Sequence, residues 1–178
     1  GGVVEAAPGR WGAEAQERGH QDQALQAAMI NKKNVKRYSF LKRQSDERQY
    51  CSPGIDLPLC SFSRSREYPE YHTHKDNFNV VTQKGLEGSF NVVKKIIDAI
   101  ELELYPKTTM FGEPNLGKRE LYPTLSQRGK NNKLRLRMNL IAQSDGMTNI
   151  FKIAGLLNIP LDKLCDEYSI LKAKKVLK

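Results

Sequence analysis

The sequence has 178 residues and carries 29 Lys and Arg against 20 Asp and Glu, which gives a net charge of +9. Its 39% of apolar residues exclude wholesale disorder, and no stretch approaches the run of about 18 apolar residues that a membrane span needs. The three cysteines, at positions 51, 60 and 165, match neither a disulfide framework nor a zinc knuckle. We therefore expect one ordinary domain or two small ones, with reduced thiols, in the cytoplasm.

Residues 1–29 differ in composition from the rest of the chain. They hold no Lys, Asn or Ile, whereas all 18 Lys and all 11 Asn lie after Met29. We therefore predict that residues 1–29 are a leader or vector-like segment, disordered and unrelated to the remainder. The alternative is a mobile helical arm, rich in Gln and Ala, around Ala13 to Ala28.

Two short strands and a polar loop are expected next. Residues 31–41 contain β-forming side chains at alternating positions, and residues 55–62 read as a strand near a sheet edge because Pro58 lies within them. The polar segment 63–79 should be a loop. It holds an unusual density of groups that can bind metals or move protons, among them Glu70, His72, His74 and Asp76.

The clearest helix in the sequence begins after Thr82, a suitable N-cap residue, and is stopped by Pro106. Apolar residues recur at steps of three and four, which places them in one stripe along the helix: Leu86, Phe90, Val93, Ile97, Ile100 and Leu104. This stripe is expected to be buried. Residues 107–131 follow as an irregular connector, rich in Gly and Pro.

Three short helices are predicted after the connector, within residues 134–142, 148–158 and 160–171. A tight turn before the last of them makes a winged-helix-like unit. Residues 128–178 carry a net charge of +7, which raises the question of DNA binding. We expect no groove reading, because Asp162, Asp166 and Glu167 are predicted to face outward near the start of the third helix.

Five Lys and Arg residues lie before and along the first of these helices. We expect them to form a solvated face or a surface that docks on an acidic neighbour. They are Arg128, Lys130, Lys133, Arg135 and Arg137.

The pair His72 and His74 is weak as a metal signal on spacing alone, because two histidines with nearby acids do not complete a zinc site. A longer succession of motifs adds specificity. It comprises Ser-Asp-Glu-Arg-Gln-Tyr-Cys-Ser-Pro-Gly at 45–54, Glu-Tyr-Pro-Glu-Tyr-His-Thr at 67–73, Asp-Asn at 76–77, Glu-Pro at 113–114, Leu-Gly-Lys-Arg at 116–119 and Leu-Tyr-Pro-Thr at 121–124. Taken in order, these motifs resemble the C-terminal part of a bacterial aminopeptidase-like family in the zinc aminopeptidase and glutaminyl cyclase superfamily.

The resemblance implies an α/β fold, namely the C-terminal part of a zinc-peptidase-like α/β sandwich over residues 30–127. A small all-α winged-helix-like domain over residues 128–178 would follow. It assigns His72 as the last metal-binding histidine and Asp76 as its supporting acid. Asp46 and Glu47 match positions at the rim of the active site, where Glu47 stands in place of the usual histidine. Glu70 and Tyr71 flank His72 in the same motif.

In such enzymes two zinc ions polarise the attacking water and the scissile peptide or amide carbonyl, while a glutamate takes the proton. The resemblance places the other metal ligands and the general base in an N-terminal half that this sequence lacks. We therefore expect part of a zinc-dependent hydrolase, inactive as this isolated chain. The alternatives are a winged-helix module that binds protein or nucleic acid and, less favoured, a stand-alone enzyme using the 45–76 loop. A homo-oligomer is left open.

Overall fold

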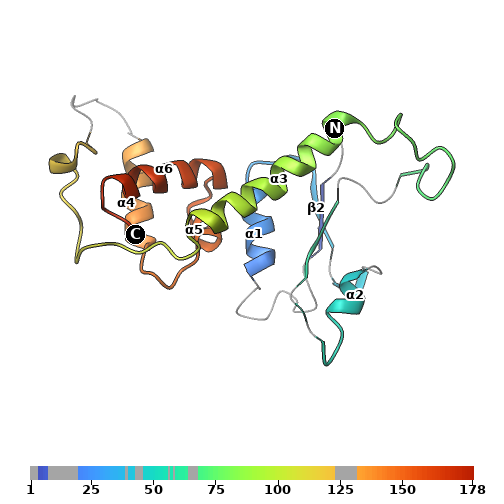
Figure 1. Ribbon diagram of the computed structural model, residues 1–178, viewed down its shortest axis with the longest axis horizontal. Helices are drawn as coiled ribbons and strands as arrows, with labels where there is room; N and C mark the ends of the chain where they lie inside the picture. The colour runs from blue at the N-terminus through green and yellow to red at the C-terminus, as the bar shows by residue number, and fades with distance from the viewer. Residues whose placement is uncertain are drawn as a thin grey trace. The chain divides into compact units, whose positions relative to one another are not determined.

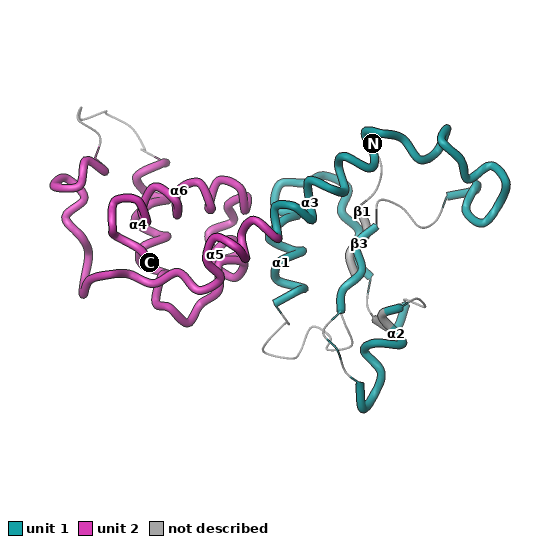
Figure 2. The backbone as a smooth tube through the Cα atoms, in the orientation of Figure 1, with its two compact units in different colours: residues 1–96 teal, residues 97–178 magenta. Residues whose placement is uncertain are grey.

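The structure is a computed structural model that describes residues 4–7, 20–38, 40–42, 46–55, 57, 59–63, 68–122 and 132–178. The chain divides into two compact units, residues 1–96 and residues 97–178 (Figure 2). Helices dominate the described residues, which contain three strands in one sheet (Figure 1). None of the helices among the described residues combines the length and the apolar character needed to cross a membrane.

The sheet of the first unit has the strand order β2-β1-β3, with β1 at Val4–Ala7, β2 at Val35–Arg37 and β3 at Ser61–Ser63. β1 pairs parallel with β2 and antiparallel with β3. The two strands predicted from the sequence are therefore present, although the second is confined to the end of the predicted range. The central strand, β1, comes from residues 1–29 and was not predicted.

Helix α1, His20–Ala28, also lies within residues 1–29 and contributes to the core of the first unit. Leu25, Ala28 and Met29 are buried in one apolar cluster with Val92, and four partly buried residues pack against that cluster: Val35, Cys60, Phe62 and Ile96. This corrects the prediction of a disordered leader. The shift in composition at Met29 coincides with no boundary of packing, because burial depends on where apolar side chains meet and not on which polar residues surround them. The alternative prediction for this segment, a helix around Ala13 to Ala28, agrees with the position of α1.

Two short helices precede β3. A single 3₁₀ turn spans Phe40–Lys42, and helix α2 spans Asp46–Tyr50 where a loop was predicted. The thiol of Cys51, directly after α2, is buried and donates a hydrogen bond to the carbonyl of Leu57 at 3.1 Å. This contact holds the turn that leads toward β3.

Helix α3, Gln83–Leu102, has the predicted beginning and end. The Gly85 amide donates to Thr82 Oγ1 at 3.1 Å, which is the expected N-cap contact. The helix ends four residues before the buried Pro106.

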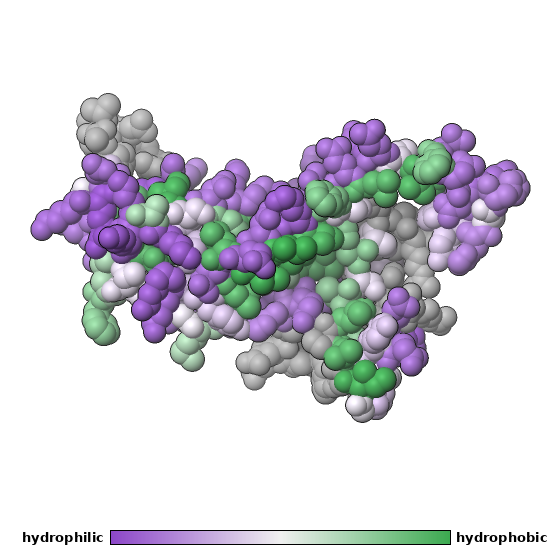
Figure 3. Space-filling view, in the orientation of Figure 1, coloured by the Kyte–Doolittle hydropathy of each residue, from purple (hydrophilic) through white to green (hydrophobic). Residues whose placement is uncertain are grey.

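The face of α3 that packs is not the predicted one. Val92, Ile96 and Ala99 form the packed face, with Val92 5% and Ala99 0% exposed. The predicted stripe is exposed instead, and Figure 3 shows apolar and hydrophilic surface side by side in the region of the helix. The exposed members are Leu86, Phe90, Val93, Ile97 and Ile100, of which Phe90 is 65% exposed. The prediction was wrong because periodicity identifies apolar positions without identifying which of them has a neighbour.

The second unit contains three helices, α4 at Asn132–Gln143, α5 at Ile150–Leu157 and α6 at Leu161–Ala173, together with a 3₁₀ turn at Gly117–Arg119. The core is formed by apolar side chains that are 2% exposed or less, among them Leu140, Ile150, Phe151, Ile153, Leu164, Tyr168 and Leu171. Asn149 caps α5 by accepting a hydrogen bond from the Lys152 amide at 2.8 Å. Asn158 ends α5 with a left-handed conformation, as predicted.

Short extended segments complete the second unit. Lys107 bridges to Asp145 and Thr108 to Leu177, both antiparallel. The Lys178 amide donates to the Lys107 carbonyl at 2.9 Å, and the Thr109 amide donates to the Val176 carbonyl at 3.0 Å. Residues 176–178 are thus paired with residues 107–109, in the segment that follows α3.

Candidate functional site

The loop between β3 and α3 carries the histidine that the sequence singled out. Residues 68–81 form consecutive tight turns, with hydrogen bonds from the Tyr71 amide to the Tyr68 carbonyl at 3.1 Å and from the Thr73 amide to the Glu70 carbonyl at 3.0 Å. Thr73 Oγ1 also donates to the Glu70 carbonyl, at 2.7 Å. The contribution of Glu70 to the turn is therefore through its backbone carbonyl.

His72 lies at the point of this loop where the backbone reverses. Its φ is 60°, in the left-handed region that non-glycine residues rarely adopt, and its side chain is exposed. The imidazole lies against the ring of Tyr71, with centroids 3.9 Å apart and planes inclined by 40°. The turn thus presents an imidazole outward while one of its faces rests on an aromatic ring.

Asp76 is tied to a second tyrosine of the same loop. Tyr68 Oη donates to Asp76 Oδ2 at 3.0 Å, and the Tyr68 and Tyr71 rings lie 5.5 Å apart. Burial raises the pKa of Tyr68, and the hydrogen bond and charge of Asp76 raise it further. A continuous set of contacts therefore joins Asp76, Tyr68, Tyr71 and His72.

The remaining predicted rim residues lie elsewhere in the first unit. Asp46 and Glu47 occupy the first two positions of α2, which Figure 1 shows well apart from the loop. Among the described residues, no three His, Cys, Asp or Glu side chains come together as a metal site would require. A catalytic zinc ion takes three protein ligands and an open position, so the described part of this chain does not form a complete site of this kind.

The cysteines are poor candidates for chemistry. Burial raises the pKa of Cys60 to about 11, with the charge of Asp22 adding to the shift. Burial raises the pKa of Cys165 to about 12, with smaller contributions from Asp166, Asp162 and Asp98. Because the thiolate is the nucleophile and the metal ligand, these thiols are inert at neutral pH.

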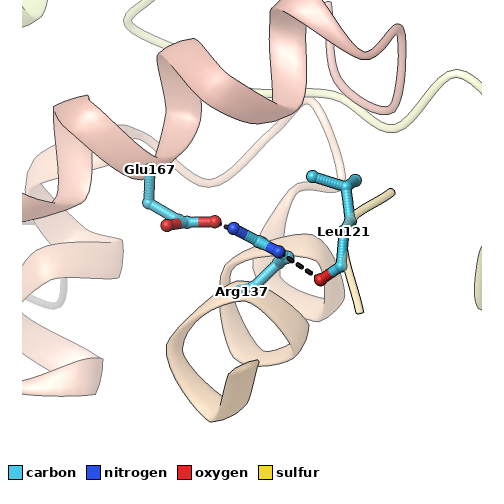
Figure 4. Close-up of polar contacts among 3 residues, drawn as sticks. All are labelled: Leu121, Arg137 and Glu167. Atoms are coloured by element: carbon cyan, nitrogen blue, oxygen red, sulfur yellow. Dashed lines mark hydrogen bonds and ion pairs between the residues drawn. The ribbon is translucent and has the colours of Figure 1, made fainter. Parts of the chain in front are cut away.

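A buried ion pair in the second unit was missed by the sequence-based interpretation. Arg137 on α4 pairs through Nε with a carboxylate oxygen of Glu167 on α6, and its Nη1 donates to the Leu121 carbonyl (Figure 4). Arg137 is 7% and Glu167 3% exposed. The predictions of an outward Glu167 and a solvated Arg137 were wrong. A signal existed, because Glu167 falls between Leu164 and Leu171 at steps of three and four, on the buried side of the helix.

Apart from Arg137 and Glu167, the charged residues predicted to lie on the surface of the second unit are exposed where the structure describes them. Asp162 and Asp166 are exposed near the start of α6, as are Lys133 and Arg135 on α4. The predicted basic residues Arg128 and Lys130 lie outside the described residues.

Comparison with known proteins assigns most of the first unit to a protein family. Residues 9–103, more than half of the chain, match the family described as Domain of unknown function (DUF4910). The chain belongs to the DUF4910 family. Residues 103–178 match the winged helix-turn-helix family HTH_47. The DUF4910 match includes α1, so residues 9–29 are not foreign to the family, and the two matches meet at residue 103 rather than at the predicted boundary of 127.

Two comparisons find similarity between this DUF4910 chain and polypeptides of Clostridium acetobutylicum. A protein provisionally named a polysaccharide biosynthesis protein with aminopeptidase-like domain is 43% identical over 89 residues, which are 47% of this chain and 20% of that protein. A crystal structure provisionally described as a peptidase superposes with a TM-score of 0.78 at 23% identity, over 99% of this chain and 39% of the other. The chain therefore shares a peptidase-like fold and spans a minor part of each of these proteins.

Proposed function

We propose that this chain forms part of an aminopeptidase-like zinc hydrolase, in which it supplies His72 as one metal ligand. The exposed imidazole of His72, held on a left-handed turn within the Tyr-His-Thr motif, is the observation that carries the proposal. The aminopeptidase-like name of the 43% identical relative supports it. The peptidase core is proposed to be an α/β sandwich of which the three-stranded sheet is one portion.

The residues around His72 fit a positioning role. Asp76 fixes Tyr68, and the Tyr68 and Tyr71 rings limit the orientations that the His72 ring can take. A metal-binding histidine gains affinity when neighbouring groups restrict its rotation in this way. In this arrangement Asp76 acts on His72 through the two tyrosines, in keeping with the supporting role that the resemblance implies for it.

The remaining ligands and the general base are proposed to come from polypeptide beyond these 178 residues. A pair of zinc ions, when bound, would polarise the attacking water and the carbonyl of a peptide or amide substrate. This chain would contribute the His72 ligand on one side of that site, with Asp46 and Glu47 of α2 placed at its rim by the complete fold. We expect the isolated chain to bind zinc weakly and to release no amino acids from peptides.

Zinc content and aminopeptidase activity test this proposal. Both should be measured for the chain alone and for the chain combined with the part of the Clostridium acetobutylicum relative that has no counterpart in it. The expected result is zinc and turnover in the combination and neither in the chain alone. About two zinc ions and turnover in the chain alone would contradict the proposed incompleteness, and a folded combination without zinc would contradict the assignment as a zinc hydrolase.

A protein-binding role for the winged-helix unit is a second candidate, favoured by the exposed Asp162 and Asp166 at the start of α6. Carboxylates at that position repel the phosphates of a DNA groove. Binding to a duplex should therefore be weak and unaffected by Arg135→Ala. A tight, salt-dependent affinity for DNA that falls with this substitution would reverse the assignment.

A further inference from the structure

Helix α3 is apolar around more than half of its circumference. At about 100° per residue, its apolar and small positions cover an arc of about 200°, whereas one packed face needs about 100°. Val92, Ile96 and Ala99 on one side of this arc are covered. The opposite side is the α3 stripe, Leu86, Phe90, Val93, Ile97 and Ile100, whose members are 47% to 65% exposed.

The exposed stripe is continuous and long. Its five residues follow steps of four, three, four and three along a 20-residue helix, so they form one row over almost its whole length. Scattered apolar side chains on a surface need no explanation, but a continuous apolar band marks a contact with another polypeptide.

A second copy of this chain is a poor occupant for the stripe. The helix is about 30 Å long and about 10 Å wide, so one face offers on the order of 300 Å². A stable interface buries about 800 Å² on each partner. Pairing two α3 helices through their stripes would leave most of that area unsupplied, whereas a segment that covers the stripe and also pairs with an edge of the three-stranded sheet would bury more.

A sheet layer from a longer peptidase-like polypeptide is the better occupant. The solved Clostridium acetobutylicum structure shares the fold over 99% of this chain, yet this chain covers 39% of it. In α/β folds, helices cover both faces of a mostly parallel sheet, and a helix with a wide apolar arc contacts more than one neighbouring element. The sheet of the first unit has three strands among the described residues, which is few for such a layer.

We propose that the α3 stripe is the docking face for the strand-bearing segment that completes the peptidase-like layer. This inference rests on the proposed function for the identity of the partner, although not for the existence of the exposed face. In the completed layer, the first unit covers one part of the apolar arc of α3 and the completing segment covers the adjoining part. The first unit would thus serve as a scaffold for the completing segment.

Co-expression tests the proposal with a defined probe. The probe is the Clostridium acetobutylicum aminopeptidase-like relative from which the segment equivalent to this chain has been deleted. Tagged full-length versions of this chain, wild type, Phe90→Asp and Asn91→Asp, are used to recover it. Asn91→Asp is the matched control, since it adds the same charge at the neighbouring exposed position on the polar side of the helix. Circular dichroism verifies that each variant is folded.

The expected result is that wild type and Asn91→Asp recover the probe equally and that Phe90→Asp recovers at least tenfold less. Equal recovery by all three, or recovery by none of them, would overturn the proposal. Sedimentation of the chain by itself gives an independent readout: a dimer that Phe90→Asp dissociates would assign the stripe to a second copy and would also overturn it. Measuring zinc in the complex recovered by the wild-type chain distinguishes docking from metal chemistry. Recovery of the probe by wild type without bound zinc would leave this inference standing while the proposed function fails.

Discussion

Replacing Arg137 by methionine would leave a carboxylate without its cation in the interior of the second unit. Glu167 is 3% exposed, and the Leu121 carbonyl would lose its guanidinium donor at the same time. Removing one partner of a buried ion pair costs about 3–5 kcal/mol. Since a domain of this size is stable by about 5–15 kcal/mol, Arg137→Met should remove a large share of the stability of this unit.

Urea unfolding followed by circular dichroism measures the effect. With a denaturant slope of about 2 kcal/mol per molar, the midpoint of the second unit should fall by roughly 2 M. If the two units unfold separately, the two transitions must be fitted separately. Glu120→Gln is the surface control, because Glu120 pairs with Lys174 at 2.6 Å but is exposed, and its midpoint should stay close to wild type.

The double variant Arg137→Met with Glu167→Leu completes the test. Replacing a whole buried ion pair with apolar side chains is often neutral or stabilising, so this variant should recover most of the lost stability. A fall for Arg137→Met no larger than that for Glu120→Gln would refute the reasoning. So would a double variant that is less stable than Arg137→Met alone.

Three further predictions follow from local contacts. Because burial raises the pKa of Cys60 to about 11 and that of Cys165 to about 12, both thiols should react with iodoacetamide far more slowly at pH 8 than after unfolding; complete alkylation of the folded chain within minutes would contradict this. Hydrogen bonds from the Thr148 and Met147 amides lower the pKa of Asp145 below its ordinary 3.8, so its contribution to stability should be present above about pH 4 and be lost as the pH falls through the lowered pKa. Thermal unfolding between pH 2 and 6 should therefore vary less for Asp145→Asn, and an unchanged profile would count against it. Removing the α5 cap with Asn149→Ala should cost about 1 kcal/mol in urea unfolding. Asn139→Ala, on the exposed side of α4, is its control, and equal losses would rule out the capping role.

Local chemistry made the helices predictable. Thr82 at the start of α3, Pro106 beyond its end and Asn158 at the end of α5 act through the backbone next to them, and all three behave as the sequence indicated. The winged helix-turn-helix match over residues 103–178 agrees with the three predicted helices.

Contacts between distant segments were not predictable in the same way. The pairing of β1 with β2 and β3 joins residues about 30 to 60 positions apart in the chain. The Arg137 and Glu167 pair likewise needs α4 and α6 to be placed before either charge has a partner. For α3, the sequence identified the apolar residues correctly but not the covered side, because that depends on which neighbours are present.

The candidate site followed from the resemblance more than from physics. The sequence marked His72 and Asp76 by their order in a motif, and the structure adds the left-handed turn and the intervening tyrosines. A metal site needs ligands brought together from several segments, and the described residues bring no three candidate ligands together.

The zinc content of the completed protein, compared between His72→Ala and His74→Ala, tests the central claim most directly. Both histidines are exposed and lie two residues apart in one loop, so the second variant controls for any general effect on the loop. We predict that zinc and activity fall together in His72→Ala and remain at wild-type levels in His74→Ala. Full zinc loading in His72→Ala, or equal losses in both variants, would contradict the account.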